Sequence, residues 1–314
     1  MPLRQKSIPN NFFLGMREIV CKAKFAYLLN RLQSLFPKHY TFYPRTWIAL
    51  QEMMTEVIKL SAKELNSMTF IVKPDGGSEG RGIFLLQGLK QLETLYFQIT
   101  ESVVIQKYIS NPYLIDGFKF DLRLYAVLTN LNPLETYLFR DGLARFCTVP
   151  YQAPNSKNMR HTCMHLTNYS LNKNNPSFIL MNNPHEGSKR TITSVFQIME
   201  NLGHSIDIIW LAIEQLIAKT IIAMLPSLKI EFDSWNTIHK IPDNKFSCFH
   251  VSKKSKDIFH FVYCYDFKTN NTRICMLYFN IMTICLYLSV DITFNLTTSI
   301  SVWYNITDTR IATI

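Results

Sequence analysis

The chain has 314 residues, of which 47% are hydrophobic and 18% are charged, and it carries a formal net charge of +10. This length and composition support one or two folded domains and exclude a collagen-like, intrinsically disordered or small disulfide-stabilised protein. The seven cysteines form no CxxC pair, which favours a reducing compartment and argues against a zinc site, while the positive charge attracts polyanions such as nucleic acid, an anionic membrane or an acidic polypeptide.

The N-terminal part of the chain has the hydrophobic pattern of helices. Residues 16–35 place apolar side chains at helical spacing between lysines and arginines, so we expect an amphipathic helix there. Pro44 restricts Tyr43 to extended geometry, so residues 40–47 are expected to form a loop or short strand that leads to a second helix over 48–65. The basic N-terminus lacks the apolar stretch of a secretory signal, which favours the cytosol.

From residue 68 the pattern changes to that of strands. Five runs with the pattern of strands follow one another, namely TFIVKP, GIFLL, VVIQKYI, KFDLRLYAVLT and ETYLFRDGLARF. Turn signals between the runs predict a largely antiparallel sheet. These signals are Asp75-Gly76, Asn111-Pro112, Asp116-Gly117, Asn132-Pro133 and Asp141-Gly142. Residues 191–225 then return to a helical pattern, with an apolar face that includes Ile209, Trp210 and Ile213.

Beyond Phe249 the sequence changes in character. Residues 259–267 and 274–290 are rich in aromatic and aliphatic side chains and contain a single charged residue between them. The second run has 17 residues before Asp291, fewer than the about 20 that a membrane helix needs. We therefore expect buried strands or an irregular tail here rather than a membrane span.

Four of the ten glycines lie within seven positions, at Gly76, Gly77, Gly80 and Gly82, between two predicted strands. A loop with few Cβ atoms can bring backbone N–H groups close to phosphate oxygens, and Lys73 on the preceding strand supplies a positive charge. The segment is not a Walker A loop, because no GK[ST] follows it, and it is not a dinucleotide-binding fingerprint, because a strand comes next. The alternative is an ordinary flexible turn.

Several polar segments downstream support a ligand site. Lys119, Asp121 and Arg123 alternate along a predicted strand, so they share one face, which is otherwise explained as a solvated face with balanced charges. Arg145 has the side chain best suited to bind a carboxylate. The segment HLTNYSLNK, residues 165–173, is either a turn that satisfies its own hydrogen bonds or a wall of a binding site, and His165 alone is more typical of a core histidine than of a catalyst.

Together these segments resemble the tubulin-tyrosine-ligase-like family, and in particular its polyglutamylase members. The likeness covers residues 5–249 and is carried by FYPRTW, the IVKP strand with its glycine-rich loop, QKYI, GFKFDLRLY, GLARF and HLTNYSLNK, in this order. The resemblance implies an α+β fold of ATP-grasp type, with largely antiparallel sheets and flanking helices, and the change of composition after Phe249 adds an irregular C-terminal tail. We therefore expect three regions: an N-terminal helical, substrate-side region (1–66), an ATP-grasp-like catalytic region (67–249), which is incomplete, and a divergent hydrophobic tail (250–314).

The activity that the resemblance implies is ATP-dependent addition of glutamate to glutamate side chains of tubulin C-terminal tails, with elongation favoured over initiation. ATP would activate a carboxylate as an acyl phosphate, which the amino group of free L-glutamate would attack. The expected cofactors are therefore ATP and Mg²⁺, and the expected partners are tubulin or microtubules and free glutamate. Nucleic acid and membrane binding are not expected. The expected location is the cytoplasm and the microtubule cytoskeleton, including the cilium or basal body.

The resemblance also assigns roles by motif position. The nucleotide-binding residues would be Lys73, Glu79, Gly80, Arg81, Gly82, Gln106, Lys107, Tyr108, Ile109, Lys119, Phe120, Asp121, Thr167 and Asn168. Residues 106–109 would form a hinge that pairs with adenine. The catalytic residues would be Lys73, Lys119 and Arg123, of which Arg123 would steady the reacting phosphate. Arg145, Ser170 and Lys189 would hold the incoming glutamate.

The chain departs from the family after Cys248. The family motifs ILGFDILLD and LKPWLLEVNxSPS, whose Asp, Glu and Asn bind Mg²⁺, are not found in this sequence. The nearest match is Asp266 followed by Asn280, with Tyr278 where the family has Glu. The metal ligands are therefore left unassigned. This departure motivates a second hypothesis, a catalytically inactive module that binds microtubules through its basic face.

Overall fold

The structure is a computed structural model that describes residues 21–57, 59–76, 79–98, 102–131, 133–181 and 185–239. The predicted runs at 259–267 and 274–290, and the segment from Asp266 to Asn280, lie outside these described residues. The elements in chain order are the helix α2 (Lys22–Leu35), the strand β1 (Thr46–Trp47), α3 (Leu50–Val57), α4 (Ala62–Ser67), β2 (Thr69–Pro74), β3 (Phe84–Gln87), α5 (Gly88–Gln98), β4 (Val103–Lys107), β5 (Leu114–Ile115), β6 (Phe118–Leu131), β7 (Leu134–Phe146), α6 (Thr162–His165), α7 (Tyr169–Asn172), β8 (Lys189–Thr191), α8 (Ile192–Asn201) and α9 (Ile206–His239).

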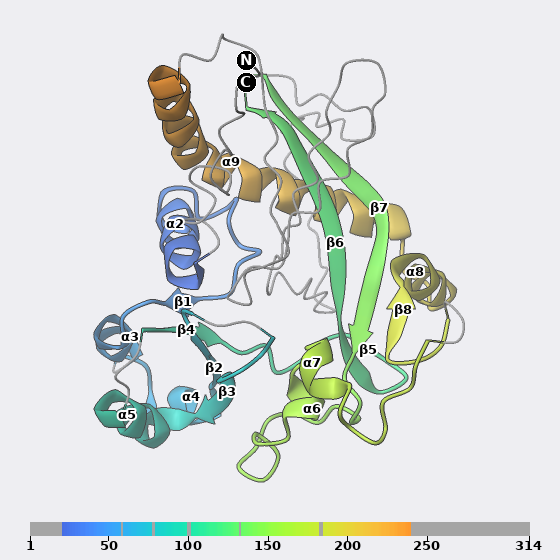
Figure 1. Ribbon diagram of the computed structural model, residues 1–314. Helices are drawn as coiled ribbons and strands as arrows, with labels where there is room; N and C mark the ends of the chain where they lie inside the picture. Colours follow the sequence, from blue (N-terminus) through green and yellow to red (C-terminus); the bar gives the residue numbers. More distant parts are fainter. Residues whose placement is uncertain are drawn as a thin grey trace, which may run out of the picture.

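The first sheet is antiparallel and has the strand order β1-β4-β2-β3. The strand β2, one of its two central strands, is buried over nearly its whole length, which fits a strand that is covered on both faces. Phe70 and Val72 of β2 pack with Ile105 of β4 and with Met53 and Leu92 from the helices α3 and α5. These helices lie on the outer side of the sheet in Figure 1. The opposite face of the sheet is therefore turned toward the rest of the molecule.

The second sheet has the order β5-β6-β7-β8 and is built around the long hairpin of β6 and β7. The turn from β5 into β6 is Asp116-Gly117, and both residues have positive φ, at 55° and 77°. Helices α8 and α9 cover one face of the hairpin, where Leu128, Ile192 and Ile213 are completely buried. The two sheets with flanking helices confirm the predicted α+β class with largely antiparallel strands.

Helices α2 and α9 pack side by side and connect the two sheets (Figure 1). Ala26 and Leu29 of α2 are fully buried against Ala223 of α9. Residues 206–234 of α9 are long and apolar enough to cross a membrane by length and composition, but 61% of their most apolar window is buried inside the protein. The packing against the second sheet therefore explains this apolar helix as a core helix.

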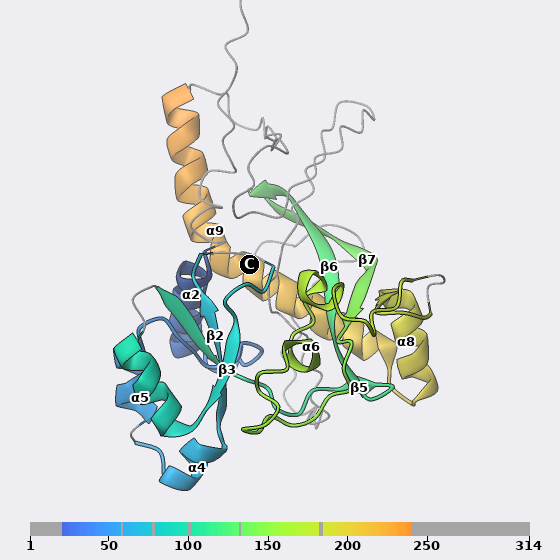
Figure 2. The ribbon, with the colours of Figure 1, turned by 60° about the horizontal axis from the view of Figure 1, so that its bottom comes forward.

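The short helices α6 and α7 lie between the two sheets in both views (Figures 1 and 2). A small apolar cluster joins them to the first sheet, with Ile71, Leu85 and Tyr108 packed against Leu166. The polar segment 165–173 is therefore placed where the two sheets face each other.

Three local predictions differ from the structure. The single helix expected over 48–65 is two helices, because Ser61 and Glu64 form a capping box that starts α4. The helix α5 was not expected from the sequence pattern. Asp141-Gly142 is not a turn, because β7 continues through it.

Gly142 is required at its position because the backbone of β6 comes very close. A Cβ added there would lie 2.1 Å from the Arg123 carbonyl oxygen and 3.0 Å from Ile192 Cδ1. We expect Gly142→Ala to lower the free energy of unfolding by at least about 3 kcal/mol, because backbone atoms have to move. The matched control is Gly76→Ala, where nothing lies within 4 Å of the added Cβ. Urea denaturation of both variants tests this, and equal stability of the two would contradict the close approach.

Candidate functional site

The glycine-rich loop connects β2 to β3 as a hairpin, as predicted. Glu79, Gly80 and Gly82 all have positive φ, at 64°, 85° and 69°, and the glycines adopt this conformation without strain. The loop is clamped onto α7, because the Ser170 hydroxyl donates a hydrogen bond to the Glu79 carbonyl. A Cβ on Gly80 would lie 2.9 Å from the Asn168 side chain. The loop and the polar segment are thus in direct contact, while Gly77 lies outside the described residues.

The beginning of the hairpin also contacts α2. The Asp75 carboxylate accepts a hydrogen bond from the Ala23 backbone N–H at 2.8 Å, and the Asp75 carbonyl accepts one from Lys22 Nζ at 3.2 Å. At the other end of the loop, Arg81 pairs with Glu79 and its side chain is 82% exposed. The guanidinium group of Arg81 is therefore accessible to an anionic ligand.

Lys73 is buried beside the loop, on β2. Its ammonium group donates to Gln106 Oε1 at 2.8 Å, and the Gln106 amide donates in turn to Thr46 Oγ1 at 2.8 Å. Both ends of the Gln106 side-chain amide are therefore used in hydrogen bonds, the oxygen by Lys73 and the nitrogen by Thr46. The backbone N–H groups of Lys107 and Tyr108 donate to the carbonyls of Arg45 and Thr69, so the predicted adenine hinge has to use other backbone groups of residues 106–109.

Lys119 comes from the second sheet and is also buried. Its ammonium group donates to the Tyr108 hydroxyl at 2.9 Å and to the His165 carbonyl at 3.0 Å. Gln106 is the second-last residue of β4, and Tyr108 follows the last residue of this strand. The two lysines, from different sheets, are therefore held by neighbouring side chains at the end of β4.

His165 lies next to Tyr108 and Lys119, and its imidazole ring is neutral. Its Nε2 lies 3.2 Å from the carbonyl oxygen of Asn158, and because a carbonyl can only accept a hydrogen bond, Nε2 carries the proton. Nδ1 therefore accepts a hydrogen bond from the Tyr108 hydroxyl at 3.2 Å. Burial, and next the positive charge of Lys119, lower the pKa of His165 from 6.5 to about 4. The histidine is therefore a hydrogen-bonding element of the core.

This pKa predicts acid sensitivity of the fold. Between pH 6.5 and about 4 the unfolded chain binds a proton at His165 that the folded chain does not bind, so stability falls as the pH falls through this window. We expect a loss of about 3 kcal/mol that is absent in His165→Gln. The exposed His39→Gln is the control and should keep the wild-type pH dependence. Urea titrations at several pH values measure this, and an unchanged acid slope in His165→Gln would refute the assignment.

Asp121 and Arg145 form a nearly buried ion pair across β6 and β7. Arg145 Nε donates to Asp121 Oδ1 at 2.8 Å, and a second guanidinium nitrogen donates to Oδ2. Phe120 points the opposite way, stacked on Phe146, which confirms the predicted alternation of charged and apolar faces. The carboxylate of Asp121 is therefore engaged by Arg145 before any ligand binds.

Lys189 extends this pair to a row of three charges. Lys189 on β8 lies opposite Arg145 on β7, which lies opposite Asp121 on β6. Its ammonium group is 3.5 Å from the centre of the Tyr169 ring, next to Ser170. Burial, and next the charge of Arg145, lower the pKa of Lys189. The three residues predicted to hold glutamate are thus near one another, although the Ser170 hydroxyl already bonds to the loop.

The donor set at this site fits a nucleotide polyphosphate. It offers the Lys73 and Lys119 ammonium groups, an arginine on the loop, and a hairpin with little Cβ. It does not fit a magnesium cage, since the described residues contain no group of three His, Cys, Asp or Glu side chains that could hold a metal ion.

Sequence reasoning missed two buried residues that brace the site. Thr46 was seen only as part of FYPRTW, although its hydroxyl accepts from Gln106. Asn172 was seen only as one of several polar residues. Its side chain accepts from the Thr148 N–H and hydroxyl and donates to the carbonyls of Leu166 and Asn168, so it fastens the polar segment to the end of β7. A polar residue inside a motif was the available signal for both.

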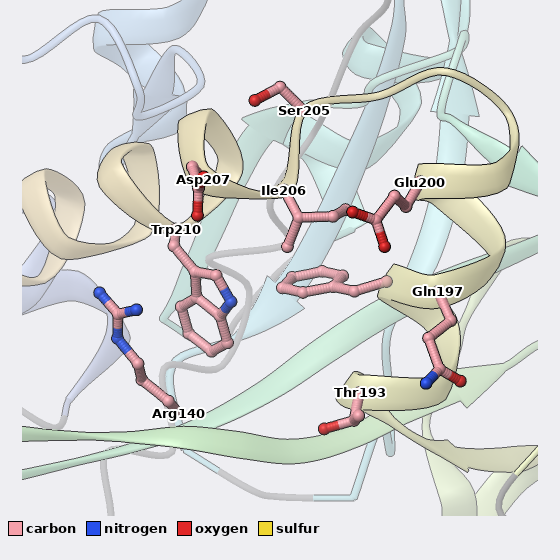
Figure 3. A pocket seen from close by; sticks show the side chains of 9 residues that line it. Arg140, Thr193, Gln197, Glu200, Ser205, Ile206, Asp207 and Trp210 are labelled. Atoms are coloured by element: carbon pink, nitrogen blue, oxygen red, sulfur yellow. The ribbon is translucent and has the colours of Figure 1, made fainter.

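A separate cavity of about 360 Å³ lies at the corner of α8 and α9 (Figure 3). Arg140 of β7, Glu200 of α8, and Asp207 and Trp210 of α9 line it. The Arg140 guanidinium pairs with Glu214 and lies 5.5 Å from the centre of the Trp210 ring. None of the predicted site residues lines this cavity.

The chain is similar to known proteins over most of the described part. The tubulin-tyrosine ligase family matches residues 4–248. The chain is 43% identical over 228 residues to tubulin polyglutamylase TTLL11 of Mus musculus, an alignment that covers 71% of this chain and 31% of that protein. It is 38% identical over 246 residues to a probable beta-tubulin polyglutamylase of Tetrahymena thermophila, covering 77% of this chain and 20% of that protein. It is 37% identical over 241 residues to tubulin polyglutamylase TTLL6 of Mus musculus, covering 77% and 28%. The chain thus spans less than a third of the length of these relatives, and the predicted resemblance is confirmed.

Proposed function

This chain belongs to the tubulin-tyrosine ligase family and has its ATP-grasp-like fold, and from this premise we propose that it is an ATP-dependent ligase that adds glutamate to tubulin. The relatives that it matches are named tubulin polyglutamylases, which supports tubulin as the protein substrate. We further propose that it elongates polyglutamate on tubulin C-terminal tails. Its place would be the cytoplasm at microtubules, including those of the cilium or basal body.

The observation that carries the proposal is that Lys73 and Lys119 are held by Gln106 and Tyr108, at the end of β4 and directly after it. The two lysines come from different sheets, are 5% and 4% exposed, and lie beside a clamped glycine hairpin. The ammonium groups of these two lysines, one from β2 and one from β6, supply the positive charge that an anionic ligand between the sheets requires.

The proposed chemistry follows from the lack of a good leaving group on a carboxylate. When bound, ATP supplies a phosphoryl group that converts the carboxylate into an acyl phosphate with phosphate as leaving group. Lys73, Lys119 and the loop would bind and orient the polyphosphate, and Arg123 would balance the negative charge that develops. Arg145 and Lys189 would hold the two carboxylates of free glutamate. Mg²⁺ enters the proposal only as the counter-ion of ATP, because the described residues hold no group of three His, Cys, Asp or Glu side chains that could bind it.

In the resulting division of labour, residues 67–249 form the catalytic region and residues 1–66 contribute the substrate side. The structure places Thr46 and Arg45 of the N-terminal region in contact with β4, where Gln106 and Lys107 lie. This contact supports a joint site for the two regions.

The test is incorporation of radiolabelled glutamate into microtubules by the full chain with ATP and Mg²⁺. We expect label on tubulin that is lost when the C-terminal tails are removed by protease. Lys73→Met should abolish incorporation, while Lys90→Met, the same change at an exposed lysine of α5, should not. Salt-sensitive pelleting with microtubules without incorporation would instead support the inactive binding module. The absence of incorporation would end the proposed ligase function, and the absence of pelleting as well would also end the binding-module alternative.

A further inference from the structure

We propose that Thr46 is a positioning residue for Lys73. Its hydroxyl sets the orientation of the Gln106 amide, and this amide holds the Lys73 ammonium group in place. What Lys73 binds rests on the proposed function, whereas the orientation itself is a property of the chain's own hydrogen bonds.

The three side chains form a continuous buried path. Thr46 Oγ1 donates to the Pro44 carbonyl at 2.7 Å, Gln106 Nε2 donates to Thr46 Oγ1 at 2.8 Å, and Lys73 Nζ donates to Gln106 Oε1 at 2.8 Å. Thr46, Gln106 and Lys73 are 1%, 4% and 5% exposed. Since water has little access, hydrogen bonds within the protein decide the geometry.

The Pro44 carbonyl fixes which atoms donate and which accept along this path. A hydroxyl has one proton, and the Pro44 carbonyl can only accept it, so Thr46 Oγ1 is an acceptor on its other side. It therefore selects the NH₂ end of Gln106 and turns the amide oxygen toward Lys73. With the amide reversed, the NH₂ group would face an ammonium group and two donors would meet without an acceptor.

The pairing of the strands makes this path specific. Thr46 and Gln106 are direct partners across β1 and β4, and Ile71 of β2 is the partner of Gln106 on the other side. The short strand β1 thus places a hydroxyl opposite Gln106, 60 residues away in the sequence. The N-terminal region contributes to the site through this contact.

Two substitutions separate the hydroxyl from the shape of the side chain. Thr46→Val keeps the volume and removes the hydroxyl, and Thr46→Ser keeps the hydroxyl. The matched control is Thr69→Val on β2, because Thr69 is equally buried and its hydroxyl has no hydrogen-bond partner among the described residues.

The first measurement needs no nucleotide. The rate at which acetic anhydride modifies Lys73 in the folded chain is followed by mass spectrometry. We expect Thr46→Val to raise this rate about five-fold, the factor that corresponds to one lost hydrogen bond, while Thr46→Ser and Thr69→Val stay near the wild type. Equal rates in Thr46→Val and the wild type, or equal increases in Thr46→Val and Thr69→Val, would overturn the proposal.

The second measurement is titration with a fluorescent ATP analogue below the unfolding temperature of every variant. Thr46→Val should bind about five-fold more weakly, but should cause no further loss in a Lys73→Met chain, because it acts through Lys73. The same loss in both backgrounds would show a general structural role and refute positioning. A changed Lys73 rate in a protein that binds no nucleotide would support the positioning role and contradict the proposed function.

Discussion

Lys73→Met is expected to weaken ATP binding by about 10- to 100-fold. The substitution keeps most of the buried volume but removes the ammonium group, and a charge-assisted hydrogen bond contributes about 1.5–3 kcal/mol. Its loss also leaves Gln106 Oε1 without the donor that it has at 2.8 Å. Titration of the purified chain with a fluorescent ATP analogue measures the dissociation constant.

The control is Lys90→Met, which removes the same charge from the exposed face of α5. It should change ATP affinity less than two-fold, because the charge of an exposed lysine is screened by solvent. If Lys73→Met and Lys90→Met bound ATP equally well, Lys73 would have no part in the nucleotide site.

Asp121→Asn is expected to lower the free energy of unfolding by about 3–5 kcal/mol. The Asp121 and Arg145 side chains are only 8% and 18% exposed, so the substitution leaves a poorly solvated guanidinium group without its carboxylate. Replacing both partners by apolar residues, as in Asp121→Leu with Arg145→Met, should recover much of this loss, because no buried charge is left alone. Urea denaturation without nucleotide measures each variant.

Glu56→Gln is the matched control for this change. Glu56 accepts two hydrogen bonds from Arg45, at 3.1 and 2.6 Å, but the two side chains are 42% and 45% exposed. An exposed pair contributes at most about 1 kcal/mol, so Glu56→Gln should cost far less than Asp121→Asn. Similar losses in the two variants would show that burial does not strengthen the requirement for Asp121.

The alternation of side chains predicted the strands and part of the site. Lys119 and Asp121 share a face opposite Phe120. This arrangement could be predicted because the two-residue periodicity of a strand is a local property of the sequence. The break between α3 and α4 was also local, in the capping box at Ser61, but the apolar pattern across it concealed the break. Asp141-Gly142 misled for another reason: the close approach of the Arg123 carbonyl, not a turn, requires that glycine.

The contacts between distant segments could not be predicted from the sequence pattern. Thr46 meets Gln106 across 60 residues, and Tyr108 meets His165 across 57. Nothing near Thr46 in the sequence distinguishes a hydroxyl that orients an amide from one that caps a turn. The resemblance named the lysines, whereas the residues that hold them in place became visible only with the strands paired.

The row of Asp121, Arg145 and Lys189 constrains the length of the strands β6, β7 and β8. Side chains alternate between the faces of a sheet, so one residue added between Gly142 and Arg145 would turn the guanidinium group away from Asp121. The far end of the hairpin, where Leu131 pairs with Leu134, is free of this constraint. Insertions and deletions in this hairpin should therefore be tolerated at its tip and not near its base, where a shift of one position would replace the Arg145 guanidinium group on this face by an apolar side chain.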